Sequence, residues 1–234
     1  YYTVVWSGNY LNYLASPSAS ISAKTRLDVA REAAIDVVKG TSGVNISLMR
    51  FSSNSDGGFV DIPLSPVEDL TTSFEDAINL YDPAGGTPME ESLYEAYRYL
   101  NGDTVTYGKD SQSIDITNIK KRDNDGFISD YDGSTISTPS VAASRNTSNS
   151  NKYKLASALE CTPTKIILFS DGEPSNDKGA NDAISKLVKN ISFESGLSGL
   201  STNCSGDGAC AEELAYYMYR NDHRPTDIDG KQII

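Results

Sequence analysis

Two short segments of this 234-residue chain combine glycine with a side chain that carries an oxygen donor. Residues 85–88 read Gly-Gly-Thr-Pro and contain Thr87, and residues 169–172 read Phe-Ser-Asp-Gly and contain Asp171. Hydroxyl and carboxylate oxygens are hard ligands that suit Mg²⁺ or Mn²⁺, and flexible glycines allow a loop to approach an ion closely. The residue types in both segments are therefore compatible with binding a divalent cation.

Each segment also has a simpler reading. Gly-Gly-Thr-Pro is common as a helix-initiating turn, with Thr87 as the cap and Pro88 in the first turn, and Asp-Gly after a strand is commonly a turn. The order of the elements favours a joint role, because a helical pattern follows Thr87 and a continuous apolar run precedes Asp171.

The chain around these segments alternates between helical and strand patterns. The sequence predicts helices at residues 25–39, 74–81, 89–100, 181–189 and 211–220. It predicts strands at residues 44–51, 59–62, 165–169 and 231–234. Residues 165–169 are apolar between polar neighbours, as in a central strand covered on both faces. We therefore expect an α/β fold with a doubly wound, Rossmann-like, mostly parallel sheet flanked by helices, and Asp171 at its ligand-binding edge.

Residues 104–155 differ from the rest of the chain. Ser, Asn, Asp and Thr dominate this stretch, and apolar periodicity fades. A long segment with little core-forming material is usually functional or disordered. We expect a polar surface insertion, with short hairpins allowed, inside a single domain that spans residues 1–234.

Composition limits the partners of the chain. It contains 20 Lys and Arg against 32 Asp and Glu, a formal net charge of −12. This charge repels phosphate backbones and anionic lipid, so we expect no nucleic-acid partner. The chain contains no run of about 18 apolar residues, so we expect no transmembrane segment. No signal peptide is visible at the start, which we interpret as the interior of a longer precursor.

The three cysteines leave two readings open. Cys204 and Cys210 flank a Ser-Gly-Asp-Gly-Ala loop that is flexible enough to close into a small disulfide ring, and Cys161 is then left over. The alternative is three reduced, semi-buried thiols. The spacing fits no zinc site.

One further stretch has the composition of a calcium loop. Asp123, Asp125 and Asp130 lie in it, but the EF-hand register places Lys121 at the first ligand position. A separate Ca²⁺ site at these aspartates is the lesser alternative. The single histidine, His223, has no nucleophile near it in a recognisable setting, so triad hydrolysis has little support.

Together, the segments at residues 85–88 and 169–172 resemble the von Willebrand factor A family. Its metal-ion-dependent adhesion site uses Asp-x-Ser-x-Ser after the first strand, a threonine on a glycine-rich loop and an aspartate that ends a later strand. The resemblance implies that Thr87 and Asp171 are metal ligands for Mg²⁺ or Mn²⁺, with Ca²⁺ as an alternative. The first motif is missing, so we expect the domain to be incomplete at its N-terminal strand. Two protein ligands leave most of an octahedral shell to water, which predicts weak binding by this chain alone.

A narrower resemblance covers most of the chain. It rests on four blocks, at residues 6–14, 25–31, 169–177 and 213–225, which are similar to the N-terminal region of PilC/PilY-type tip adhesins of bacterial type IV pili. This family implies a secreted, extracellular protein at the pilus tip that promotes adhesion and pilus assembly. Its partners would be pilins or minor pilins and a host or surface receptor. The extracellular setting also implies a disulfide between Cys204 and Cys210.

These expectations describe a non-enzymatic binding module. The first alternative is a cation-dependent hydrolase, and the second is a structural pilus assembly factor that uses no metal. The sequence upstream discriminates between them, because Asp-x-Ser-x-Ser there favours adhesion and a strand ending in a nucleophile favours catalysis.

Overall fold

The structure is a computed structural model. It describes residues 24–52, 56–79, 81, 86–108, 142–155, 164–170, 172–193 and 199–221, together with the backbone of four short strands between residues 113 and 137. Asp171, Asp123, Asp125, Cys161 and His223 lie outside the described residues, as does the strand predicted at residues 231–234.

The elements follow one another in this order: α2 (Arg26–Gly40), β1 (Asn45–Phe51), β2 (Gly58–Pro66), the 3₁₀ helix η1 (Val67–Asp69), α3 (Thr71–Asn79), α4 (Met89–Leu100), β3 (Ser113–Ile114), β4 (Lys120–Arg122), β5 (Ile128–Asp130), β6 (Ile136–Ser137), the 3₁₀ helix η3 (Ala142–Ser144), α5 (Asn181–Val188) and α6 (Ala211–Arg220). The five predicted helices are confirmed within a few residues at each end.

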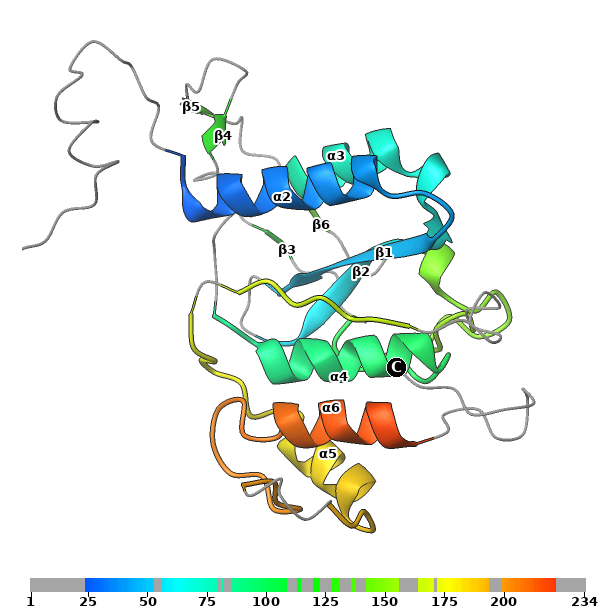
Figure 1. Ribbon diagram of the computed structural model, residues 1–234, viewed down its shortest axis with the longest axis vertical. Helices are drawn as coiled ribbons and strands as arrows, with labels where there is room; N and C mark the ends of the chain where they lie inside the picture. The colour runs from blue at the N-terminus through cyan, green and yellow to red at the C-terminus, as the bar shows by residue number, and fades with distance from the viewer. Residues whose placement is uncertain are drawn as a thin grey trace, which may run out of the picture.

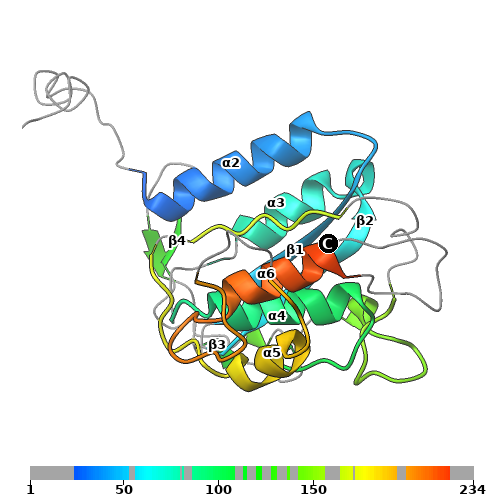
Figure 2. The ribbon, with the colours of Figure 1, turned by 60° about the horizontal axis from the view of Figure 1, so that its bottom comes forward.

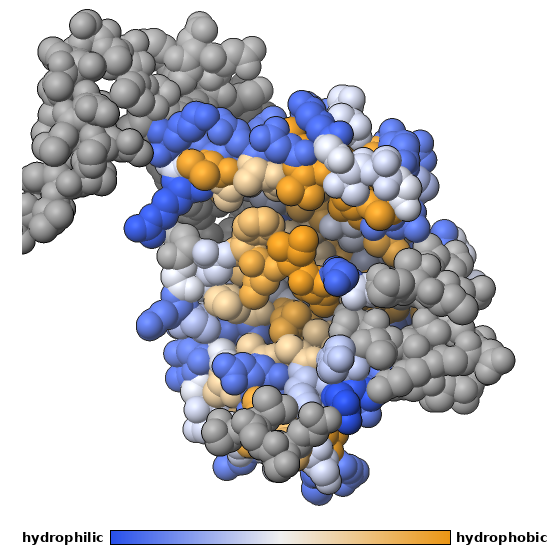
Figure 3. Space-filling view, viewed as in Figure 1, coloured by the Kyte–Doolittle hydropathy of each residue, from blue (hydrophilic) through white to orange (hydrophobic). Residues whose placement is uncertain are grey.

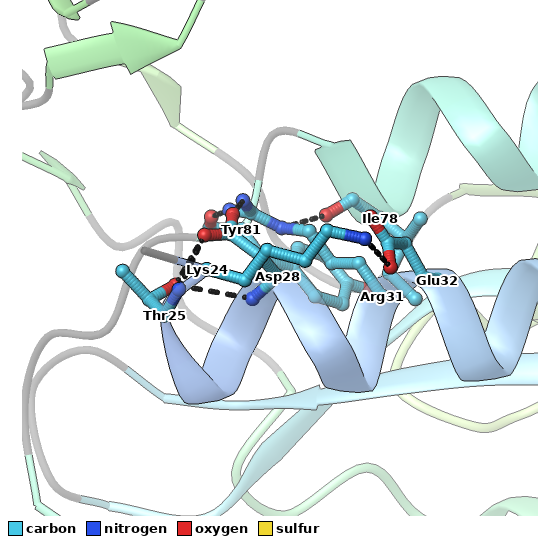
Figure 4. A network of polar contacts seen from close by, with 7 residues as sticks. All are labelled: Lys24, Thr25, Asp28, Arg31, Glu32, Ile78 and Tyr81. Carbon is cyan, nitrogen blue, oxygen red and sulfur yellow. Dashed lines mark hydrogen bonds and ion pairs between the residues drawn. The ribbon is translucent and has the colours of Figure 1, made fainter. Parts of the chain in front are cut away.

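Local capping explains where α2 begins. The hydroxyl of Thr25 accepts a hydrogen bond from the backbone N–H of Asp28 at 3.1 Å, and the Asp28 carboxylate accepts one from the N–H of Thr25 at 2.7 Å. This reciprocal pair satisfies two N–H groups that the first turn leaves free. Arg31 then donates to the backbone carbonyls of Ile78, at 3.1 Å, and of Tyr81, which ties α2 to the end of α3 (Figure 4).

The sheet differs from the predicted one. Strands β1 and β2 pair antiparallel as a hairpin, from Asn45 opposite Pro66 to Phe51 opposite Gly58, with irregular register around Leu48. The other described pairs, β3 with β6 and β4 with β5, are also antiparallel and two-stranded. The prediction of a mostly parallel, Rossmann-like sheet is therefore wrong. The physical reason is that β1 and β2 are joined by a short turn, which brings successive strands together antiparallel, whereas parallel strands need a long crossover.

The predicted central strand at residues 165–169 is also wrong. Residues 164–170 have no regular secondary structure, and no backbone hydrogen bond between described residues involves them. Ile167 is 72% exposed and Phe169 is 57% exposed. In Figure 1 this run crosses the middle of the view between the hairpin and α4, and Figure 3 shows apolar surface in the middle of the same face. An apolar run indicates a preference for burial, but a strand also requires a partner for its N–H and C=O groups.

The described elements stack in layers. Figures 1 and 2 show α2 and α3 on one side of the β1–β2 hairpin, and α4 followed by α6 and α5 on the other. Three buried clusters fill the spaces between them. The first joins α2, α3 and the hairpin around Val38, Ile62, Val67, Leu70, Phe74 and Ile78. The second joins the hairpin, α4 and the chain that follows α4 around Val60, Tyr99, Leu100, Val105 and Tyr153. The third joins α4, α5 and α6 around Tyr94, Tyr97, Ala180, Ile184, Val188, Cys210, Leu214 and Met218.

The two ends of the polar stretch at residues 104–155 belong to the second cluster. Val105 is fully buried and Tyr153 is 1% exposed, and the Tyr153 ring packs edge-on against Tyr99 with centroids 5.2 Å apart. Backbone bridges pair Thr104 with Lys152 and Arg145 with Tyr153. The ends of this stretch therefore fold onto α4 as part of the core.

Candidate functional site

Thr87 lies beside the segment that follows Asp171. An isolated antiparallel bridge joins Thr87 to Ser175. The N–H of Thr87 donates to the Ser175 hydroxyl at 3.1 Å, and the N–H of Ser175 donates to the Thr87 carbonyl at 3.3 Å. On either side of Asp171, the Gly172 N–H donates to the Ser170 hydroxyl at 3.3 Å. The glycine-rich loop and the segment after the Phe-Ser-Asp-Gly motif are thus in contact.

The helix after Thr87 is capped by a distant residue. Pro88 precedes the first residue of α4, and no side chain from this turn caps the helix. Asp177 supplies the cap instead, since its carboxylate accepts from the N–H of Glu90 at 2.8 Å and of Glu91 at 3.1 Å. A carboxylate is favoured there because the N-terminus of a helix carries partial positive charge. The predicted cap by Thr87 is not formed.

Asn176 turns the chain between the bridge and the cap. It has a φ of 54°, in the left-handed region that asparagine tolerates better than most residues. This turn allows Ser175, on one side of Asn176, to face Thr87. Asp177, on the other side, faces the start of α4. Backbone geometry therefore couples the Thr87 loop to the N-terminus of the helix.

Three glutamates of α4 are buried, which the sequence analysis missed. Glu90 and Glu95 are fully buried and Glu91 is 1% exposed. Glu95 accepts from the N–H groups of residues 106–108 and from the Tyr153 hydroxyl, at 2.5 to 3.2 Å. Glu91 accepts from the N–H of Gly57 at 2.7 Å and of Gly179 at 2.6 Å. Each of these carboxylates holds loop backbone against α4.

Gly179 shows how tight this packing is. A Cβ atom at that position would lie 2.5 Å from Glu91 Oε1 and 2.8 Å from the Tyr107 hydroxyl. Only glycine allows the backbone to come this close to Glu91. No local sequence signal marks this arrangement, because Gly57 and Gly179 lie 34 and 88 residues from Glu91.

Glu90 stands in a different environment from the other two glutamates. Its Oε2 accepts from the Cys210 N–H at 2.7 Å, while its Oε1 is buried and accepts no hydrogen bond from the part of the chain that the structure describes. The pKa of Glu90 is raised to about 7, chiefly by burial. The Cys210 N–H opposes this rise, and the carboxylates of Asp177, Glu91 and Glu213 add to it. Burial likewise raises the pKa of Glu91 and of Asp177, although backbone N–H groups oppose it at both.

A disulfide joins Cys204 to Cys210, the two cysteines expected to form a ring, with Cα atoms 5.3 Å apart. This separation lies in the ordinary range for a disulfide. Cys210 is fully buried and directly precedes α6. The ring therefore ends at the residue whose N–H binds Glu90.

The described residues do not assemble a metal centre on their own. No group of three or more His, Cys, Asp or Glu side chains among them is arranged to hold an ion. Asp130, the one residue of the suggested calcium loop within a described element, ends strand β5, where only the backbone is placed. No helix in the described part of the chain has both the length and the apolar composition needed to cross a bilayer.

Compared with known proteins, the chain shows no significant match to a family model, a curated protein or a solved structure.

Proposed function

We propose that this chain is a non-enzymatic adhesion module of a type IV pilus tip, which binds a host or surface ligand through a divalent cation held by Thr87 and Asp171. The observation that carries the proposal is the bridge between Thr87 and Ser175. Ser175 follows Asp171 by four residues. The bridge supports the proposal because it places Thr87 beside a segment that follows Asp171 closely in the sequence, and hydroxyl and carboxylate oxygens suit Mg²⁺ or Mn²⁺.

The contacts of three nearby carboxylates, those of Glu91, Glu95 and Asp177, favour binding over hydrolysis at these residues. Glu91 and Glu95 accept hydrogen bonds from loop backbone with both carboxylate oxygens. Asp177 uses both of its oxygens to cap α4. Carboxylates engaged in this way are not free to act as a general base, which would have to reach a substrate or water. They support a rigid framework behind Thr87.

Substitution of the two proposed ligands tests this function. We expect Thr87→Ala and Asp171→Ala each to weaken Mg²⁺ and Mn²⁺ binding about tenfold or more, because each removes one oxygen from a shell that has few protein donors. Calorimetric titration measures the affinity. Attachment of piliated cells to a surface, with and without chelator, measures the biological consequence.

Two exposed residues outside the site provide matched controls. Thr202→Ala and Asp69→Ala remove the same groups from exposed positions elsewhere, in a loop and at the end of η1. They should leave ion binding and attachment unchanged. Equal ion affinity in Thr87→Ala, Asp171→Ala and the controls would contradict the cation site. Chelator-resistant attachment that depends on neither Thr87 nor Asp171 would favour the metal-independent assembly role.

A further inference from the structure

Glu90 lies at a junction where the start of α4 meets the segment before α5 and the segment before α6. It belongs to the first turn of α4, and its Oε2 binds the N–H of Cys210, the residue before α6. Asp177, from the segment before α5, binds the N–H of Glu90 itself. The junction therefore joins α4 to both of the helices that cover it.

The charge at this junction is one-sided. The carboxylates that act on Glu90 are Glu91 from α4, Asp177 from the segment before α5 and Glu213 from α6. None of the ion pairs between described residues involves any of these four groups. Asp207, which accepts from the Asp177 N–H at 2.8 Å, has its own partner in Lys178 at 3.8 Å. Backbone N–H groups thus supply the described contacts of the four acids.

Glu90 is the member that these contacts satisfy least. Glu91 and Asp177 accept hydrogen bonds at both oxygens, whereas Glu90 and Glu213 each accept one from the described part of the chain. Of the four acids, only Glu90 has an oxygen, Oε1, that is buried with no hydrogen-bond partner among the described residues. A fully buried carboxylate with a bare oxygen beside other carboxylates is strongly disfavoured. Protonation of Oε1 removes that charge and leaves Oε2 free to accept from the Cys210 N–H.

We propose that Glu90 is a pH-dependent latch between α4 and the start of α6, closed when its carboxyl group carries a proton and loosened when the group ionises. The segment it holds is the loop at residues 199–210, which is also held by two other hydrogen bonds, one to a carboxylate and one to a backbone carbonyl. The N–H of Ser201 donates to Glu213 at 2.8 Å, and the N–H of Gly208 donates to the Asp177 carbonyl at 2.9 Å. Ionised Glu90 repels Glu213 and Asp177 and thereby weakens the whole junction.

The direction of the effect follows from the pKa. In the folded protein the pKa of Glu90 is raised to about 7 from an ordinary value of 4.5. The folded state therefore retains the proton more strongly than the opened state. Its stabilising contribution is fully present below about pH 4.5 and is lost as the pH rises through about 7.

Hydrogen exchange at the Cys210 amide tests the latch. We expect the opening of this amide, corrected for intrinsic exchange, to increase on the order of tenfold or more between about pH 5.5 and about pH 8. Glu90→Gln keeps an oxygen for the Cys210 N–H but cannot ionise, so its opening should change little over the same range. Glu212→Gln removes an exposed charge from the first turn of α6. In this variant, the opening of the Cys210 amide should depend on pH as it does in the unmodified protein.

Three outcomes would overturn the proposal. In the first, the opening of the Cys210 amide depends on pH equally in the unmodified protein and in Glu90→Gln. In the second, it depends on pH in neither. In the third, added Ca²⁺ protects the Cys210 amide from exchange at about pH 8, and this protection is lost in Glu90→Gln. A cation would then balance the negative charge of the junction in place of the proton. If Glu90→Gln does not fold, a ¹³C carboxyl titration of the unmodified protein decides, because a Glu90 signal that titrates near its ordinary value excludes the latch. None of these measurements depends on ion binding at Thr87.

Discussion

At the scale of single residues, this protein uses buried carboxylates to hold its loops. Glu91 and Glu95 lie on one helix, yet their backbone N–H partners come from three separate segments. Glu91 binds Gly57 and Gly179, and Glu95 binds residues 106–108. A charged acceptor forms stronger hydrogen bonds than a neutral one, which compensates for the loss of water around the charge. The loops near Thr87 are therefore held by side chains of α4 as well as by their own turns.

The cap of α4 gives the first test at this scale. Asp177→Ala removes both acceptors at the helix N-terminus. We expect the free energy of unfolding to fall by about 1 to 2 kcal/mol, as for the loss of other helix caps. Chemical denaturation measures it, with the exposed Asp69→Ala as the control. A loss no greater than that of the control would show that Asp177 does not cap the helix in solution.

At the scale of elements, the hairpin differs from residues 164–170, which contain the apolar run at residues 166–169, in how the backbone hydrogen-bonding groups are satisfied. The hairpin pairs its own strands, and β2 buries Phe59, Val60 and Ile62 against the helices. The run has comparable apolar character but no backbone partner among the described residues, and its side chains stay exposed. Exposure of this kind adds little to folding stability, because burial of apolar area provides the stabilisation.

Paired substitutions distinguish these two environments. Ile167→Ser, at 72% exposure, should change the free energy of unfolding by less than about 0.5 kcal/mol. Ile62→Ser, at 6% exposure, should lower it by about 3 kcal/mol, because it leaves a cavity and buries a hydroxyl. Thermal and urea unfolding of both variants measure the difference. A loss at Ile167 as large as that at Ile62 would mean that the run is buried in solution.

At the scale of the whole molecule, the three buried clusters depend on segments that are far apart in the sequence. The second cluster combines β2, α4 and both ends of the polar stretch at residues 104–155. Arg145 also donates to the Gly108 carbonyl, so the chain on either side of residues 109–141 comes together. Both ends of the polar stretch thus belong to the core.

Two deletions test this division. Replacement of residues 109–141 by a short Gly-Ser linker should leave the domain folded, because Gly108 and Arg145 are already in contact. Removal of all residues from 104 to 155 should unfold it, because Val105 and Tyr153 leave the second cluster and Glu95 loses its described partners. Circular dichroism and cooperative thermal unfolding distinguish the two. A cooperatively folded longer deletion would contradict the role of these ends.

Part of the local structure around Thr87 could be read from the sequence, while the cation site itself stays a prediction. The glycine-rich loop lies at the start of α4, as the helical pattern after Thr87 indicated, and it contacts the segment after the Phe-Ser-Asp-Gly motif. The cap by Asp177 was not predicted, because nothing in the sequence near Asp177 points to a helix that begins 88 residues earlier. The buried glutamates were missed for a related reason: acidic residues in a helix are usually exposed, and only their distant N–H partners allow them to be buried.

The sequence by itself determined the helices of this protein. Capping at Thr25 and the helical spacing of apolar residues act between neighbours in the chain, so α2, α3, α4, α5 and α6 could be read without knowledge of the fold. Only the tertiary structure decided the sheet and the environment of each acid. A strand requires a backbone partner, and a buried carboxylate requires donors, and both come from distant parts of the chain. For that reason the run at residues 164–170 remained exposed despite its apolar side chains, while Glu90, Glu91 and Glu95 became buried despite their charge.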